Sequence, residues 1–188
     1  MIDKQTTALV VIDLQKGIVG APALPNASAD VVAHAASLAR AFRKFQMPVF
    51  LVHVTPSLDR KDALHPICDR TMPVNAQPAP DWAELVPELE AAPGDFIITK
   101  RQWGAFYGTE LDLQLRRRSI KTIVLCGIST NIGVESTARF AYEYGYQQIF
   151  VEDACSARSK EEHDHTMKYN LPRMGRVLST KDVLAELE

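Results

Sequence analysis

The chain lacks the cysteine and histidine patterns that hold metals or disulfides. Its three cysteines, Cys68, Cys126 and Cys155, are an odd number at wide spacings, and no two of them form a CxxC pair. This argues against a disulfide scaffold and a zinc knuckle, and it favours a reducing, cytoplasmic location. His163 and His165 lie two residues apart on an expected helix, so they point to different faces. We therefore expect neither a catalytic metal nor another cofactor.

Long apolar runs and strong charge are missing as well. No apolar stretch approaches the ~20 residues of a membrane-spanning helix, and the first residues lack the apolar core and cleavage site of a secretory signal. The formal net charge is -2, and no basic block is interleaved with aromatic residues. The run Arg116-Arg117-Arg118 is typical of a solvated helix face or, alternatively, of a phosphate site. We expect no membrane and no nucleic acid among the partners.

What the chain does have is the composition and patterning of one α/β domain. It has 188 residues, 46% hydrophobic and 23% charged, which suits a single globular domain over residues 1–188. Apolar runs bounded by turn residues alternate with amphipathic stretches, which predicts a three-layer α/β/α, Rossmann-like fold with a parallel sheet of about six strands. We expect strands at residues 7–13, 48–54, 95–99, 122–126, 149–152 and 175–178, and helices at 28–45, 81–89, 109–118, 130–144, 160–169 and from 181 onward.

One segment interrupts this alternation. Residues 55–80 contain five prolines and show little periodicity. A segment of this kind is expected to run over the surface as a long excursion. Such excursions often frame a binding pocket.

Three candidate catalytic positions follow separate strands. In open parallel sheets, reactive groups gather beyond the carboxyl ends of the strands. Asp13 closes the first expected strand, Lys100 follows the third, and Gly133 lies at the start of the helix after the fourth. Asp13 is either a partly desolvated acid suited to proton transfer, with Gln15 placed to orient it, or a turn cap. Lys100 either stabilises negative charge and grips a substrate carboxylate, or is a surface lysine.

The residues near these positions leave further alternatives open. Trp103, Phe106 and Tyr107 supply an apolar wall for a planar ligand, or they belong to the core. Cys126 ends an apolar strand and Cys155 follows the fifth strand, where thiols are usually buried and inert rather than nucleophilic.

Three blocks of sequence occur in an order that carries a family resemblance. They are ALVVIDLQ at 8–15, Lys100 with AFYGTEL at 105–111, and GISTNIGVESTAR at 127–139. Together they resemble the isochorismatase-like hydrolase superfamily, which includes isochorismatases, nicotinamidases and N-carbamoyl amidohydrolases. The likeness covers nearly the whole chain.

The resemblance implies a particular site. Asp13 and Lys100 match two members of a catalytic Asp-Lys-Cys set, and the cysteine of the amidase branch matches Gly133. The resemblance also implies a cis peptide bond between Ile128 and Ser129, with backbone N–H groups near Ser129 and Gly133 aimed at a substrate oxygen. Substrate contacts are accordingly expected at Ser129, Thr130 and Asn131. Family members are commonly homo-oligomers, so a dimer or tetramer is expected.

Glycine at position 133 decides which chemistry is open to the chain. Glycine has no side chain with which to attack an amide carbon, so thioester chemistry is removed. True isochorismatases resemble this chain in carrying glycine there, because enol-ether hydrolysis needs a proton donor and water. The favoured function is hydrolysis of a small-molecule enol ether of the isochorismate type, with Asp13 as general acid and Lys100 holding the substrate carboxylate. The alternative is a catalytically impaired small-molecule binding module derived from a cysteine amidohydrolase.

Overall fold

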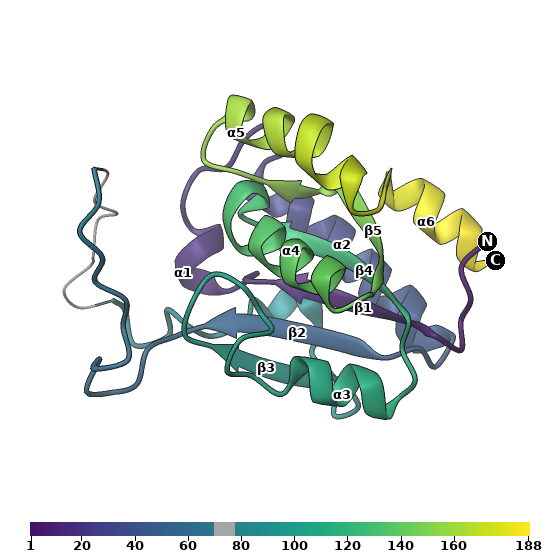
Figure 1. Cartoon of the computed structure of the whole chain (residues 1–188), viewed down its shortest axis with the longest axis horizontal. Helices are drawn as coiled ribbons and strands as arrows, with labels where there is room; N and C mark the ends of the chain where they lie inside the picture. Colours follow the sequence, from purple (N-terminus) through teal and green to yellow (C-terminus); the bar gives the residue numbers. More distant parts are fainter. Residues whose placement is uncertain (70–77) are drawn as a thin grey trace.

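A six-stranded parallel sheet forms the centre of the molecule. The computed structural model describes residues 1–69 and 78–188, and within them the strand order is β3-β2-β1-β4-β5-β6 (Figure 1). All five neighbouring pairs are parallel. The strands are β1 (Thr7–Ile12), β2 (Val49–Val54), β3 (Phe96–Lys100), β4 (Thr122–Ile128), β5 (Gln147–Ser156) and β6 (Arg176–Leu178).

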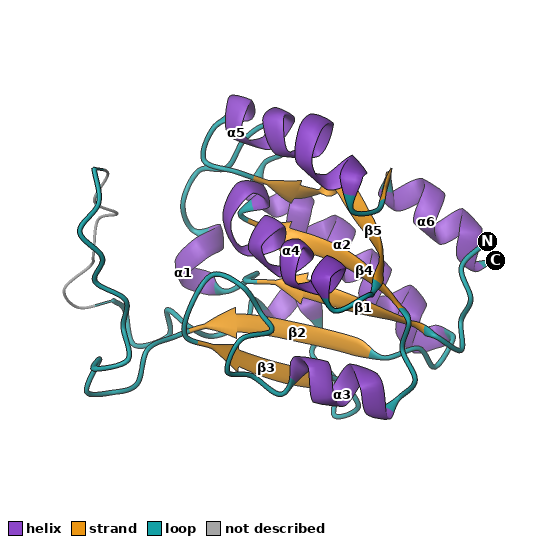
Figure 2. Ribbon diagram, in the orientation of Figure 1, coloured by secondary structure: helices purple, strands orange, loops and turns teal. Residues whose placement is uncertain are grey.

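Helices cover both faces of this sheet, which confirms the predicted three-layer α/β fold. In Figure 2, α2 (Ser28–Lys44) passes behind the strands, while α3 (Leu111–Arg117) and α4 (Glu135–Glu143) lie in front. The buried face of α2 is made of alanine, valine, leucine and phenylalanine side chains at helical spacing. The remaining helices are α1 (Lys16–Val19), α5 (Lys160–His165) and α6 (Thr180–Leu187).

The strand order reverses direction at β1. Every residue of β1 is buried, as expected for a central strand of a parallel sheet covered on both faces. From β1 the connections lead to β2 and β3 on one side and to β4, β5 and β6 on the other. In doubly wound sheets, ligands bind at this switch point, outside the carboxyl ends of the strands.

Several predicted helices differ from the observed ones. The helix expected at 81–89 is reduced to the 3₁₀ turn η1 (Pro87–Leu89), because Val86 precedes a proline and adopts an extended backbone. The helix expected at 130–144 opens with the π-helical turn η2 (Thr130–Val134), and only then does α4 begin. The helix expected at 160–169 ends as α5 at His165 and continues as the π-helical turn η3 (Thr166–Asn170).

The proline-rich excursion lies partly outside the described residues, since 70–77 are not described. Its described residues are 55–69 and 78–80, and the first of these stretches leaves the carboxyl end of β2 and extends away from the sheet (Figure 1). Leu58 and Ile67 on this segment are fully exposed.

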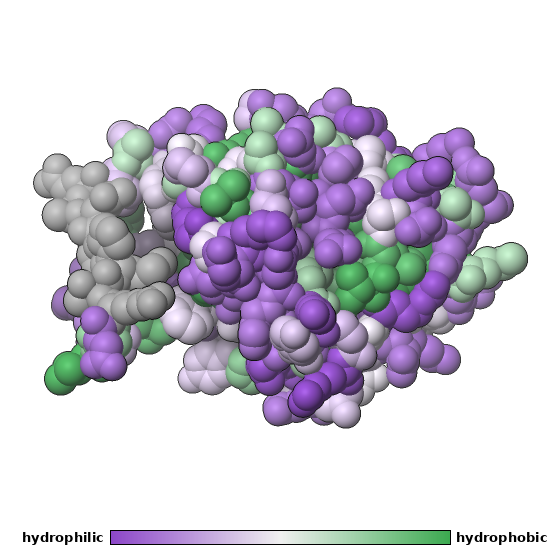
Figure 3. All heavy atoms as spheres, turned by 90° about the horizontal axis from the view of Figure 1, so that it is seen from above, coloured by the Kyte–Doolittle hydropathy of each residue, from purple (hydrophilic) through white to green (hydrophobic). Residues whose placement is uncertain are grey.

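The face of the molecule seen from above is mainly polar (Figure 3). Seen from above, hydrophilic residues dominate the face, and one larger hydrophobic area lies toward the side of the chain termini (Figure 3). Among the described residues, no helix has the length and apolar character needed to cross a bilayer.

Candidate active site

Asp13 is held at the end of β1 by its backbone. Its N–H donates to the carbonyl of Val52 at 2.9 Å, and its φ of 55° lies in the left-handed region, which aspartate tolerates better than most residues. The chain turns sharply there, and the side chain is 6% exposed. The end of β1 therefore places a carboxyl group inside the protein rather than in water.

Gln15 anchors this turn without contacting Asp13. Its Oε1 accepts from the N–H of Val54 at 2.8 Å, and its Nε2 donates to the carbonyls of Val54 and Trp82 at 3.1 and 3.2 Å. The side chain is fully buried. Gln15 therefore ties the β1 turn to β2 and to the segment before η1, and these hydrogen bonds favour this structural role over the predicted orienting of Asp13.

Lys100 forms a buried ion pair with Asp13. Its Nζ lies 2.7 Å from Asp13 Oδ2 and donates also to the carbonyl of Trp103 at 2.7 Å. Because β2 separates β1 from β3, the two side chains and the hydrogen bond between them together span about two strand spacings, or about 10 Å. Lys100 is 1% exposed, so the surface-lysine alternative is wrong.

Burial makes Asp13 an unusually weak acid. Removal from water raises the pKa of its carboxyl group from the usual 3.8 to about 6, although the Lys100 charge and hydrogen bond oppose this rise. Its Oδ1 is buried and has no hydrogen-bond partner within residues 1–69 and 78–188. The group thus has one oxygen bound to a cation and one oxygen on which a proton can reside near neutral pH.

Gly133 faces this pair directly. A Cβ atom built on Gly133 would lie 3.1 Å from Asp13 Oδ2 and 3.6 Å from Lys100 Nζ. It would also lie 2.9 Å from Ile12 Cγ2, closer than real Cβ contacts allow. The fold therefore brings the three predicted catalytic positions together, and a methyl group of Ile12 crowds the place where a side chain at 133 would begin.

The turn between β4 and α4 has the expected backbone. The Ile128–Ser129 peptide bond is cis, as the resemblance implied. The Ser129 hydroxyl donates to Asn131 Oδ1 at 3.0 Å, and the Ser129 carbonyl accepts from the N–H groups of Ile132 and Val134. Ser129 and Asn131 are partly exposed.

Thr130, in contrast, points into the protein. It is fully buried, and its Oγ1 lies 2.9 Å from Nδ1 of His163 on α5. Burial lowers the pKa of His163 below 6.5. Sequence reasoning considered His163 only as a metal ligand, and no local pattern indicates that it supports this turn.

The three aromatic residues after β3 do not form one wall. Phe106 is 4% exposed, and its ring packs 5.4 Å from Tyr144 and 5.8 Å from Tyr146 between centroids. Trp103 and Tyr107 are 59% and 69% exposed. The structure thus favours the core alternative for Phe106, while Trp103 reaches the site through its backbone carbonyl.

Neither buried thiol is poised as a nucleophile. Burial raises the pKa of Cys126 well above its usual value and that of Cys155 to about 12. Both lie within strands of the sheet and are completely buried. The expectation that they are inert is consistent with this environment.

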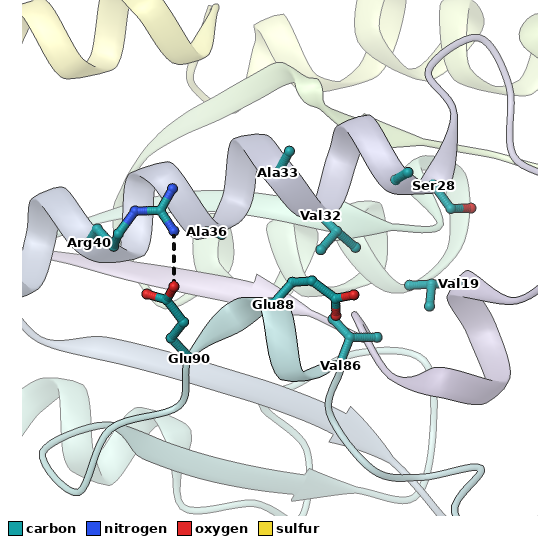
Figure 4. Close-up of a pocket in the computed structure, with 10 residues that line it drawn as sticks. Val19, Ser28, Val32, Ala33, Ala36, Arg40, Val86, Glu88 and Glu90 are labelled. Atoms are coloured by element: carbon teal, nitrogen blue, oxygen red, sulfur yellow. Dashed lines mark ion pairs between the residues drawn. The ribbon is translucent and has the colours of Figure 1, made fainter.

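A separate hollow of about 540 Å³ lies between α1, α2 and the segment around η1. Small apolar side chains of α1 and α2 line it together with Val86 and Glu88 at η1, and Arg40 pairs with Glu90 at one end, 3.6 Å apart (Figure 4). Asp13, Lys100 and Gly133 are not among the residues that line it. Within the described residues, no group of three or more His, Cys, Asp or Glu side chains is arranged to hold a metal ion.

Comparison with known proteins shows the family of the chain. Residues 7–182 match the isochorismatase domain family. The uncharacterized isochorismatase family protein YwoC of Bacillus subtilis is 52% identical over 188 residues, which is 100% of this chain and 97% of that protein. An isochorismatase family protein of known structure from Burkholderia thailandensis is 45% identical with a TM-score of 0.94, covering 100% of this chain and 97% of that one. The chain therefore belongs to the isochorismatase family.

A second relative, an amidohydrolase by name, matches part of the chain. Ureidoacrylate amidohydrolase RutB of Azorhizobium caulinodans is 37% identical over 91 residues, which is 48% of this chain and 40% of that protein.

Proposed function

We propose that this isochorismatase-family hydrolase cleaves a small-molecule enol ether, with Asp13 as the general acid. The observation that carries the proposal is the carboxyl group of Asp13, which is buried, has its pKa raised to about 6 and has one oxygen without a partner among the described residues. A general acid works best when its pKa lies near the working pH. Asp13 meets this condition at the edge of the sheet where ligands of such folds bind.

Glycine at position 133 supports this reaction over amide cleavage. Position 133, which faces both Asp13 and Lys100, is glycine. The thiols of Cys126 and Cys155 are buried with raised pKa values. Because a covalent acyl intermediate needs an activated nucleophile, a reaction that needs only a proton and water suits the site better.

Cleavage of the enol ether needs only the Asp13 proton and one water molecule. Asp13 Oδ1 delivers its proton to the methylene carbon of the enolpyruvyl group, and the ether carbon becomes an oxocarbenium ion. Water adds to that carbon and returns a proton to the Asp13 carboxylate. The resulting hemiketal breaks its bond to the ring oxygen, giving pyruvate and an alcohol.

Lys100 contributes charge and position. Two of its three ammonium protons are donated, to Asp13 Oδ2 and to the Trp103 carbonyl. The pairing at Oδ2 leaves Oδ1 as the oxygen that carries the transferable proton. We assign the third ammonium proton to the carboxylate of the substrate.

The alternative function, a binding module that has lost its cysteine, is less well supported. A cysteine at 133 would place its Cβ 2.9 Å from Ile12 Cγ2. Packing this tight around the glycine favours a site adapted to glycine over one from which a thiol was removed.

The test is release of pyruvate from isochorismate by the purified protein and by the Asp13→Asn and Lys100→Met variants. Loss of a general acid typically costs ~10²–10⁴-fold in rate, so Asp13→Asn should lose that much. Asp30→Asn, which changes an exposed carboxylate on α2, is the control and should retain the wild-type rate. Absence of release by the wild type, or full activity of Asp13→Asn, would refute the proposal.

A further inference from the structure

We propose that Thr137 is a positioning residue for the Lys100–Asp13 pair, because its hydroxyl joins the loop that holds Lys100 to the turn that carries Gly133. The inference rests on the proposed function, since the acid being positioned is the one assigned there. Thr137 lies on α4, and its hydroxyl bonds to Gly133 and Ala105 rather than to Asp13 or Lys100, so it acts through the two segments that it connects.

The Thr137 hydroxyl makes two buried hydrogen bonds. It donates to the carbonyl of Gly133 at 2.7 Å and accepts from the N–H of Ala105 at 3.1 Å, and the side chain is fully buried. The first bond, to the residue four positions earlier, is one that threonine often makes in helices. The second reaches a separate segment, so the hydroxyl bridges the β3–α3 loop and the start of α4.

The loop that contains Ala105 is braced as one unit. Gln102 Nε2 donates to the carbonyls of Gly104 and Tyr107 at 2.9 and 2.7 Å. A Cβ on Gly104 would lie 3.3 Å from the ring of Phe140, so the loop approaches α4 closely at this point. The position of this loop against α4 therefore sets where the Trp103 carbonyl lies.

The Trp103 carbonyl is one of two acceptors that fix the Lys100 ammonium group, and Asp13 Oδ2 is the other. Without the Thr137 hydroxyl, the Ala105 N–H loses its buried partner and the loop loses its polar link to α4. The ammonium group is then free to move with the carbonyl, away from Asp13. Because the Lys100 charge lowers the pKa of Asp13, a weaker contact raises it.

The experiment is a ¹³C NMR titration of the Asp13 carboxyl group in the full chain, with the signal assigned by its loss in Asp13→Asn. Thr137→Val replaces the hydroxyl by a methyl group of similar size, and Thr137→Ser keeps the hydroxyl. Thr166→Val is the matched control, since it removes another buried hydroxyl next to α4, one that donates to Glu135 at 2.9 Å. Thr137→Ala provides a second hydroxyl-free variant should Thr137→Val fail to fold.

We expect the pKa of Asp13 to rise by about half a unit or more in Thr137→Val and Thr137→Ala, which a roughly threefold change in its protonation equilibrium would produce. Thr137→Ser and Thr166→Val should titrate as the wild type does. An unchanged or lowered pKa in both hydroxyl-free variants, or an equal rise in Thr166→Val, would overturn the proposal. The titration needs no substrate, so a wild type that fails to release pyruvate would refute the enol-ether reaction without deciding the role of Thr137.

Discussion

Replacing Asp13 by asparagine should change how the stability of the protein depends on pH. In the folded state the pKa of Asp13 is raised from 3.8 to about 6, and burial is the main cause. A folded state with the higher pKa binds the proton more tightly than the unfolded chain does, so this group stabilises the fold progressively as the pH falls from about 6 to about 4. Above about pH 7 the ionised carboxylate carries the full cost of its burial.

The size of this effect follows from the pKa values. A change of one unit corresponds to about 1.4 kcal/mol, so the rise from 3.8 to about 6 amounts to roughly 3 kcal/mol. Asp13→Asn removes the titration while keeping the volume and an oxygen that accepts from Lys100. The difference in unfolding free energy, wild type minus variant, should therefore be larger at pH 4 than at pH 8 by roughly that amount.

Denaturant unfolding of both proteins at several pH values between 3 and 8 measures this difference directly. Glu186→Gln is a control of opposite sign, because Arg176 and the N-terminus lower the pKa of Glu186 to about 2. Glu186 stabilises the fold above about pH 4.5, and its contribution is lost as the pH falls below that value. A difference for Asp13→Asn that stays constant from pH 4 to pH 8 would refute the assignment of a raised pKa.

Two further predictions concern thiols, first one introduced at position 133 and then those of the native cysteines. Gly133→Cys alone should not confer amidase activity, because its Cβ would collide with Ile12 Cγ2, and ammonia release from an N-carbamoyl amide by this variant would contradict that reasoning. Gly133→Cys combined with Ile12→Ala removes the colliding methyl group and is the fair test of an amidase scaffold. In native protein at pH 8, iodoacetamide should modify the exposed Cys68 and leave Cys126 and Cys155 unmodified, as judged by mass spectrometry of peptides. Rapid alkylation of either buried thiol would reopen the question of a thiol nucleophile.

The strands and their ends were predictable because the signal is local. An apolar run such as residues 8–12 indicates a buried strand, and the first polar residue after it, Asp13, marks the edge of the sheet. The α/β alternation then predicted that Asp13, Lys100 and Gly133 would meet beyond the strand ends, and they do.

The remaining features depend on contacts between residues far apart in sequence. Lys100 pairs with a carboxylate 87 positions away, so its burial leaves no trace in the sequence around it. Thr137 and His163 are likewise recognised only by their partners, Ala105 and Thr130. The π-helical turns at Thr130–Val134 and Thr166–Asn170 have the same hydrophobic spacing as ordinary helix, which is why both were predicted as continuous helices.

The central claim is that this site protonates an enol ether and does not attack an amide. The most direct test incubates the purified wild-type protein with isochorismate and, separately, with an N-carbamoyl amide, and measures pyruvate and ammonia. The account predicts pyruvate release that depends on Asp13 and no ammonia above the buffer control. Ammonia release from the amide without pyruvate from isochorismate would contradict it.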